Sequence, residues 1–140
     1  MNRSFQSTTP GVARTATQAG ALAEDRALAY LRRQGLAQVV RNYRCKGGEI
    51  DLIMRAADGT LVFVEVRQRR GRGFGGAAQS ITPAKQRRVL HAAAHYLATL
   101  PSVPPCRVDV VAIEPGRIDW LPGAFDLTSA DGNGGADAAS

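Results

Sequence analysis

Hydrophobic and polar positions alternate in two short segments near the middle of the chain, residues 48–53 and 62–67. Both segments are rich in Ile, Leu, Val and Phe, and Ala57-Asp58-Gly59 lies between them. Apolar β-formers bounded by turn residues predict a pair of antiparallel strands. If the loop has three residues, Gly59 takes the left-handed position of a type I turn followed by a bulge.

The charged residues of this hairpin depend on its register. With a three-residue loop, Asp51 lies opposite Glu65, and Glu49 lies opposite Arg67. With a two-residue loop the carboxylates separate, because a slip of one residue moves every side chain to the other face. We favour the three-residue loop, since it keeps the charges apart from an apolar face that consists of Ile50, Leu52, Val64 and Val66.

The facing pair Asp51 and Glu65 has two interpretations. Two carboxylates held close together in a partly buried site repel each other unless a cation lies between them. Hard oxygen ligands of this kind suit Mg²⁺ or Mn²⁺. The alternative is a polar sheet face with solvated acids and a cross-strand ion pair between Glu49 and Arg67. The hairpin alone does not decide between them.

The flanking segments predict two helices and three more strands. Residues 20–34 have a helical period that ends at Gly35. Thr82 and Pro83 begin the second helix as its N-cap and first residue. Mixed strands flanked by helices are typical of a layered α/β fold. Further strands are expected at 37–43, 107–113 and 117–121, within one domain at 19–127 between disordered tails at 1–18 and 128–140.

Glu24 lies on the apolar stripe of the first helix. It precedes Ala27, Leu28 and Leu31 by three, four and seven residues, so all four share one face. An ionised, unpaired carboxylate on such a face costs on the order of several kcal/mol. Glu24 therefore either reaches water at the edge of the stripe or points into a polar site.

The charge of the chain indicates a polyanionic partner. The net charge is +6, with 18 Lys and Arg against 12 Asp and Glu. Arg69, Arg70 and Arg72 alternate with glycines directly after the acidic strand, and Arg44 is at the end of another strand. Arginines so placed either grip phosphate oxygens or belong to a solvated linker. Their position beside the acids favours nucleic-acid contact.

Three further observations concern location and metal ligands. No stretch approaches the length of a transmembrane helix, and no signal peptide is recognisable, so we expect no membrane association. Cys45 and Cys106 have no metal spacing and are expected to be free thiols in the cytoplasm. His91 and His95 are four residues apart without a neighbouring acid, so we do not expect a zinc site there.

The motifs resemble one known family. The block 48–53 (GEIDLI) followed by 63–66 (FVEV) closely resembles the YraN-like family of small bacterial proteins, as do 20–24, 41–44 and 107–111. The likeness spans residues 19–127. This uncharacterised family looks like a branch of the restriction-endonuclease-like superfamily, similar to archaeal Holliday-junction resolvases. The resemblance implies an α/β, three-layer fold with a central mixed β-sheet flanked by helices.

The resemblance also implies an acidic metal site. Carried onto this chain, it comprises Glu24, Asp51, Glu65 and position 67. The family motif usually has Lys where this chain has Arg67. Arg keeps the charge but cannot act as a base, because its pKa exceeds about 12. Lys85, at the start of the second helix, is a candidate substitute.

Two functions remain open. The first is a nuclease that uses Mg²⁺ or Mn²⁺ to hydrolyse DNA, perhaps branched DNA, with the phosphate held by Arg67 or Lys85. The second is a nucleic-acid-binding or scaffolding protein on a nuclease fold, with a weak or inactive site. The three acids favour the first function, and Arg67 favours the second. By analogy with resolvases we expect a homodimer.

Overall fold

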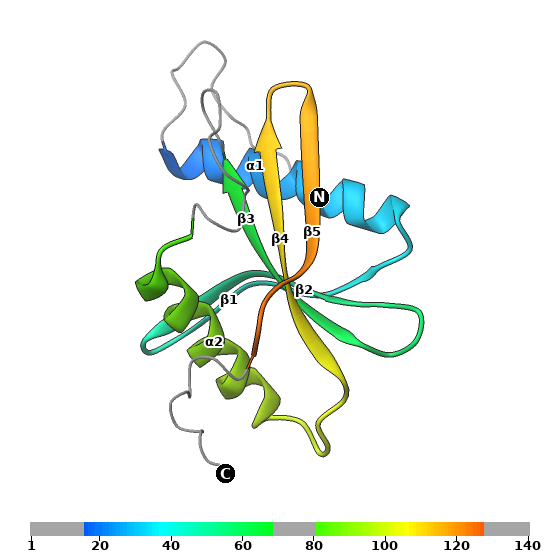
Figure 1. Cartoon of the computed structure of the whole chain (residues 1–140), viewed down its shortest axis with the longest axis vertical. Helices are drawn as coiled ribbons and strands as arrows, with labels where there is room; N and C mark the ends of the chain where they lie inside the picture. The colour runs from blue at the N-terminus through cyan, green and yellow to red at the C-terminus, as the bar shows by residue number, and fades with distance from the viewer. Residues whose placement is uncertain (1–15, 69–80, 128–140) are drawn as a thin grey trace, which may run out of the picture.

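The computed structural model describes residues 16–68 and 81–127 (Figure 1). The elements follow the predicted order of helix, three strands, helix and two strands. The first helix begins at Ala16, four residues earlier than predicted. The described residues do not include Arg69, Arg70, Arg72 or most of the expected tails. The elements are α1 (Ala16–Arg33), β1 (Ala37–Cys45), β2 (Gly48–Arg55), β3 (Leu61–Gln68), α2 (Pro83–Leu97), β4 (Cys106–Glu114) and β5 (Arg117–Phe125).

The strands form one mixed sheet in the order β1-β2-β3-β4-β5. Only β3 and β4 are parallel, and the connection between them contains α2. The other neighbouring pairs are antiparallel. The chain therefore forms a sheet of consecutive strands with a single crossover, in which β3 is central.

The two helices cover opposite faces of this sheet (Figure 1). Ala27 and Leu31 of α1 pack in one buried cluster with Val64. Val89 of α2 packs in another cluster with Phe63, the preceding residue of β3. Successive residues of a strand point to opposite faces, so the two clusters are separate layers. This confirms the predicted α/β fold with a central mixed sheet between helices.

The register of the β2–β3 hairpin is the predicted one. Leu52 pairs with Val64, and Arg55 pairs with Leu61. The three-residue loop is also confirmed, since the Gly59 N–H donates to the Ala56 carbonyl at 2.9 Å and Gly59 has φ of 93°. Glycine adopts this backbone conformation without a steric penalty.

The hairpin departs from the prediction beyond Leu52. The strands separate there, and Asp51 Oδ2 accepts a hydrogen bond from the Val66 N–H at 2.7 Å. The predicted apolar face is wrong in one position, because Ile50 packs in the α2 cluster whereas Leu52 packs in the α1 cluster. The cause is a bend of the β1–β2 pair at Asn42, which has a left-handed φ of 57°. The bend leaves polar side chains at the point where the strands part.

Other predicted features appear as expected. Thr82 caps α2 by accepting a hydrogen bond from the Lys85 N–H at 3.1 Å, and Pro83 is the first helical residue. Cys45 and Cys106 are free thiols. Within residues 16–68 and 81–127, neither helix is long and apolar enough to cross a membrane.

Candidate active site

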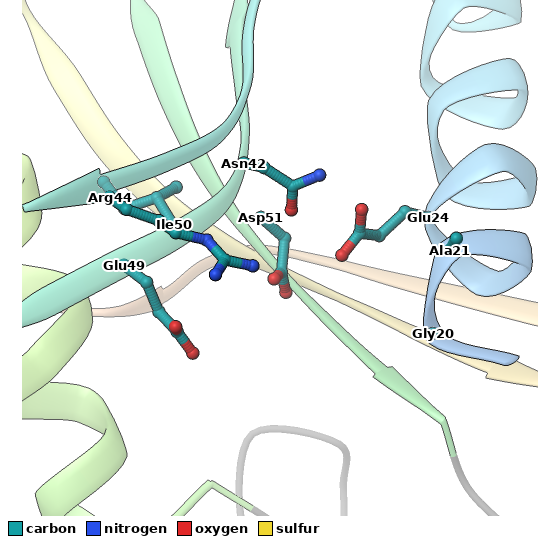
Figure 2. A pocket seen from close by; sticks show the side chains of 8 residues that line it. All are labelled: Gly20, Ala21, Glu24, Asn42, Arg44, Glu49, Ile50 and Asp51. Atoms are coloured by element: carbon teal, nitrogen blue, oxygen red, sulfur yellow. The ribbon is translucent and has the colours of Figure 1, made fainter. Parts of the chain in front are cut away.

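A polar pocket of about 300 Å³ lies where α1 faces the bend of the β1–β2 pair. Figure 2 shows Glu24 reaching from α1 toward Asp51 of β2, with the Asn42 amide between the two elements. The pocket is polar because most of its lining side chains are charged or carry an amide. It is lined by Gly20, Ala21, Glu24, Asn42, Arg44, Glu49, Ile50 and Asp51.

Glu65 lies next to Asp51 and is almost fully buried, with 2% of its surface exposed. Its Oε1 atom has no hydrogen-bond partner among the described residues. Burial, together with the charge of Asp51, raises the pKa of Glu65 to about 8. Burial likewise raises the pKa of Asp51, although the Val66 N–H opposes this. The pair thus needs a proton or a cation to be stable.

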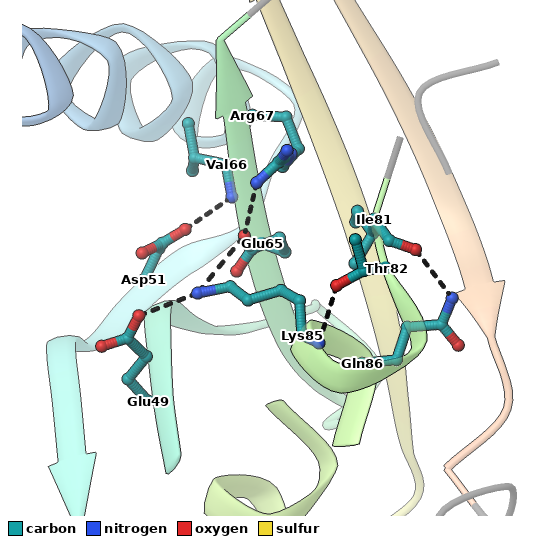
Figure 3. Close-up of polar contacts among 9 residues, drawn as sticks. All are labelled: Glu49, Asp51, Glu65, Val66, Arg67, Ile81, Thr82, Lys85 and Gln86. Carbon is teal, nitrogen blue, oxygen red and sulfur yellow. Dashed lines mark hydrogen bonds and ion pairs between the residues drawn. The ribbon is translucent and has the colours of Figure 1, made fainter. Parts of the chain in front are cut away.

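Lys85 extends from the first turn of α2 to this pair (Figure 3). Its Nζ atom donates to Glu49 Oε2 at 2.8 Å and lies 3.7 Å from Glu65 Oε2. Burial alone would lower the pKa of Lys85, but the Glu49 hydrogen bond and the Glu65 charge outweigh it and raise that pKa. Lys85 is therefore a fixed positive charge beside the buried acid.

Arg67 reaches the same carboxylate from β3. Its Nη1 atom lies 3.8 Å from Glu65 Oε2, and about a third of its side chain is exposed. The sequence left open an ion pair between Glu49 and Arg67. In the structure, Glu49 instead contacts Lys85 at 2.8 Å and Arg88 at 3.6 Å. Arg67 and Lys85 thus both flank Glu65.

Glu24 points into the polar site, which was one of the two positions expected from its place on the helix stripe. Burial and the charge of Asp51 raise its pKa, whereas Arg41 opposes this increase. Arg41 Nε lies 3.4 Å from Glu24 Oε1, and Arg41 also contacts Asp25 at 2.8 Å and the Ala21 carbonyl at 3.1 Å. Arg41 therefore fixes the start of α1 against β1.

The expected convergence of three acids is only partly present. Asp51 and Glu65 are adjacent, whereas Glu24 is drawn to Arg41. Within the described residues, no three His, Cys, Asp or Glu side chains are grouped closely enough to hold a metal ion. The separation has an electrostatic cause, because Arg41 attracts Glu24 while Lys85 and the Val66 N–H attract the other two acids.

The donor set nevertheless fits a hard divalent cation. Asp51 and Glu65 offer carboxylate oxygens, and the buried Glu65 Oε1 has no other partner among the described residues. The Asn42 amide oxygen is a neutral donor on the same pocket. Mg²⁺ and Mn²⁺ prefer such oxygen ligands.

Sequence reasoning missed Arg41 and Asn42 as parts of this site. Both belong to the 41–44 motif, but a strand pattern gives no sign of a left-handed residue. The only available signal was the residue type, because Asn tolerates this backbone better than most residues. His91 contacts the Lys46 carbonyl, and His95 contacts the Tyr43 hydroxyl.

Comparison with known proteins agrees with the sequence motifs. Residues 23–113 match the model of a family described as "Uncharacterised protein family UPF0102". The chain belongs to this family. A UPF0102 protein of Cupriavidus necator is 82% identical over 79% of this chain and 85% of its own length. UPF0102 proteins of an Acidovorax species and of Ralstonia nicotianae are 60% and 58% identical, over 81% and 84% of this chain and 89% and 91% of their own lengths.

The matched region contains every ionisable residue of the candidate site, while Gly20 and Ala21 of the pocket lie just before it. It begins one residue before Glu24 and ends within β4, so it includes Asp51, Glu65 and Lys85. The family has no assigned activity, and the names of these relatives state none. Any function must therefore be argued from the site itself.

Proposed function

We propose that this protein is a metal-dependent nuclease that hydrolyses phosphodiester bonds in DNA. One observation carries the proposal: the buried Glu65, whose Oε1 has no partner among the described residues, lies beside Asp51 and between two cationic side chains. Buried acids with unsatisfied oxygens and raised pKa values are concentrated at functional sites. The fold alone would not support the proposal, since one fold hosts many functions.

The carboxylates would hold the metal. Asp51 and Glu65 supply the direct ligands, and Glu24 contributes directly or through a water molecule. When bound, Mg²⁺ or Mn²⁺ supplies charge neutralisation at the phosphate and a lowered pKa of bound water. The protein's own part is to hold these oxygens at the edge of a pocket that α1 and the β1–β2 pair enclose.

The two cations would act on the phosphate. Lys85 and Arg67 donate hydrogen bonds to its nonbridging oxygens, which gain negative charge in the transition state. Neither side chain takes a proton, because the raised pKa of Lys85 keeps it charged at neutral pH and Arg stays charged throughout. Lys85 thereby takes the place of the lysine that the family motif usually has at position 67.

The second candidate function is binding without cleavage. Two observations favour it: Lys85 is hydrogen-bonded to Glu49, and Glu24 is held by Arg41 instead of joining the pair. A nucleic-acid-binding or scaffolding protein would keep the basic surface but would not need the acids. We further propose a cytoplasmic location, a homodimer by analogy with resolvases, and DNA as the ligand, with branched DNA as one form to test.

A cleavage assay separates the two functions. Purified protein is incubated with linear, flapped and four-way DNA in Mg²⁺, Mn²⁺ or EDTA. We expect metal-dependent cleavage that Asp51→Asn abolishes, while the matched control Asp119→Asn on β5 retains it. Equal cleavage by wild type and Asp51→Asn would indicate a contaminant and overturn the proposal, as would intact DNA in every reaction.

The same assay assigns the cations. Loss of one transition-state donor typically lowers the rate by roughly a hundredfold or more, so Lys85→Ala and Arg67→Ala are each expected to do so. Arg67→Lys should retain the rate, because it keeps the charge. If Arg67→Ala cleaves at the wild-type rate, Lys85 alone serves the phosphate.

A further inference from the structure

A second hollow, of about 560 Å³, lies on the other side of Glu49 from the candidate active site. It is formed by the outer face of α2 and the turn between β1 and β2. We call it the α2 groove, and it is lined by Gly47, Ala84, Arg87, Arg88, Leu90, His91 and Ala94. Nothing in the proposed chemistry uses these residues.

The walls of the α2 groove are held rigidly together. The Gly48 backbone packs directly on α2, since a Cβ atom there would lie 2.5 Å from the Arg88 carbonyl oxygen and 2.9 Å from the Ala92 nitrogen. His91 Nε2 lies 3.0 Å from the Lys46 carbonyl oxygen and joins the turn to the helix. Only glycine at position 48 permits this contact, so the groove is a built feature.

The α2 groove is strongly basic. The α2 sequence contains Lys85, Arg87 and Arg88 but neither Asp nor Glu. Arg87, Arg88 and the adjacent Lys46 are exposed, and neither Lys46 nor Arg87 has an ion-pair partner among the described residues. The nearest acid is Glu49, which Lys85 and Arg88 already neutralise. Cations without an ion-pair partner in residues 16–68 and 81–127 are available to an external anion.

An ion pair links the α2 groove to the candidate active site. Glu49 lines the active-site pocket, while its carboxylate contacts Arg88 of the groove at 3.6 Å and Lys85 at 2.8 Å. A linear polyanion lying along the exposed cations would therefore lead to Asp51 and Glu65. Arg guanidinium groups match phosphate oxygens in a two-pronged geometry.

We propose that the α2 groove binds the sugar–phosphate backbone of the nucleic-acid strand that enters the active site. Lys46 and Arg87 contact phosphates directly, and Arg88 joins the groove to the site through Glu49. The proposal rests on the proposed function for the direction of the strand, but the binding itself does not require cleavage. It assigns nucleic-acid contact to residues other than Arg69, Arg70 and Arg72, which the sequence suggested.

The test compares two double variants that remove the same charge. Lys46→Ala/Arg87→Ala removes the free cations of the groove, while the Lys46 carbonyl that His91 contacts is kept. The control, Arg55→Ala/Arg117→Ala, removes two exposed arginines at the far end of β2 and on β5. Thermal melting establishes that both variants fold.

Binding is measured in EDTA by fluorescence anisotropy of labelled duplex DNA over a range of salt concentrations. Each lost phosphate contact lowers the slope of log affinity against log salt by about 0.9. We expect the groove variant to lose about two units of slope and the control to keep the wild-type slope. Equal slopes for the two variants, or no binding by wild type, would overturn the proposal.

Two further arms separate this proposal from others. Binding in EDTA is measured apart from cleavage. Intact DNA in every cleavage reaction, together with a reduced slope for the groove variant, would therefore leave the groove standing and remove only the nuclease. Polyglutamate is the competitor for a protein partner. Polyglutamate and unlabelled DNA are compared at equal concentrations of negative charge. If both displace the labelled DNA equally well, the groove binds acidic peptides as readily as nucleic acid and our assignment is wrong.

Discussion

Two buried carboxylates lie on neighbouring central strands and have opposite surroundings. Asp109 on β4 is fully buried and accepts hydrogen bonds from Arg107 Nε, Trp120 Nε1 and the Gly123 N–H, each at 2.9 Å. Glu65 on β3 is equally inaccessible, but its nearest cations lie at 3.7 and 3.8 Å. Its Oε1 atom has no partner among the described residues.

The difference distinguishes a structural acid from a candidate functional one. Donors surround Asp109 from its own strand and from β5, so its ionised form contributes to the fold. Glu65 is left with an unsatisfied oxygen, which costs stability unless something outside the chain occupies the site. Natural folds keep such groups mainly where they act.

The largest expected effect is on the structural acid. Asp109→Ala leaves the Arg107, Trp120 and Gly123 donors without their buried acceptor, so we expect a loss of about 3 kcal/mol in the free energy of unfolding. Glu65→Gln should cost little or stabilise, because the neutral amide resembles the protonated carboxyl that the raised pKa of Glu65 favours. Urea denaturation of both variants measures the contrast. A greater loss for Glu65→Gln would reverse the comparison.

The second effect is a pH dependence that comes from Glu65. The raised pKa, about 8 against an ordinary 4.5, means that the folded state keeps a proton that the unfolded state releases. Stability should therefore fall as pH rises from about 4.5 to about 8 and level off above that. Denaturation at several pH values should show this fall in stability in wild type and in Asp119→Asn. Most of the fall should be absent in Glu65→Gln. A stability that rises across this range would contradict the assignment.

The sequence predicted the architecture, but it did not predict that Asp109 is fully hydrogen-bonded while Glu65 keeps an oxygen without a partner among the described residues. Apolar alternation and turn residues placed the elements and the β2–β3 register, because both depend on local patterns. That register also predicted that Asp51 and Glu65 lie close together. Asp109, however, looked like any acid within a strand, since its partner Trp120 comes from another strand and Gly123 follows a bulged pairing.

The position of Glu24 was harder to predict for the same reason. Its place on the helix stripe indicated an inward direction, which the structure has. Its ion pair with Arg41 depends on how α1 lies on β1, and no periodicity encodes that contact. The bend at Asn42 was equally hidden, because it breaks the alternation on which strand prediction rests.

The third effect is stabilisation by a divalent cation. A ligand that binds only the folded state stabilises it by about 1.4 kcal/mol at ten times its dissociation constant. We expect millimolar Mn²⁺ or Mg²⁺ to raise the melting temperature by a few degrees, and more at pH 8 than at pH 6, since the metal displaces the Glu65 proton. Differential scanning fluorimetry should show no shift for Asp51→Asn and an unchanged shift for Asp119→Asn. A shift that survives in Asp51→Asn would place the cation elsewhere.

The smallest effect concerns the backbone beside each acid. Gly123, which donates to Asp109, has a left-handed φ of 62°, and Asn42, which lines the pocket with Asp51, has φ of 57°. Glycine adopts this conformation freely, whereas other residues incur a cost of roughly 1–2 kcal/mol, less for Asn. The backbone beside Asp109 thus has glycine, which is unstrained at this φ. The candidate active site instead has Asn42, whose side chain is kept at some cost in backbone strain.

Two substitutions at this position separate backbone from side chain. Asn42→Gly should raise the free energy of unfolding by up to about 0.5 kcal/mol, and Asn42→Ala should lower it by about 1 kcal/mol, because only the second variant retains a strained Cβ. Both remove the amide that hydrogen-bonds Glu24 and holds down its pKa, so both should lose the metal-induced shift in melting temperature. Urea denaturation and scanning fluorimetry of the pair measure this directly. If Asn42→Gly keeps the full metal shift, Asn42 serves only to bend β1, and the strain at this site is structural like the turn at Gly123.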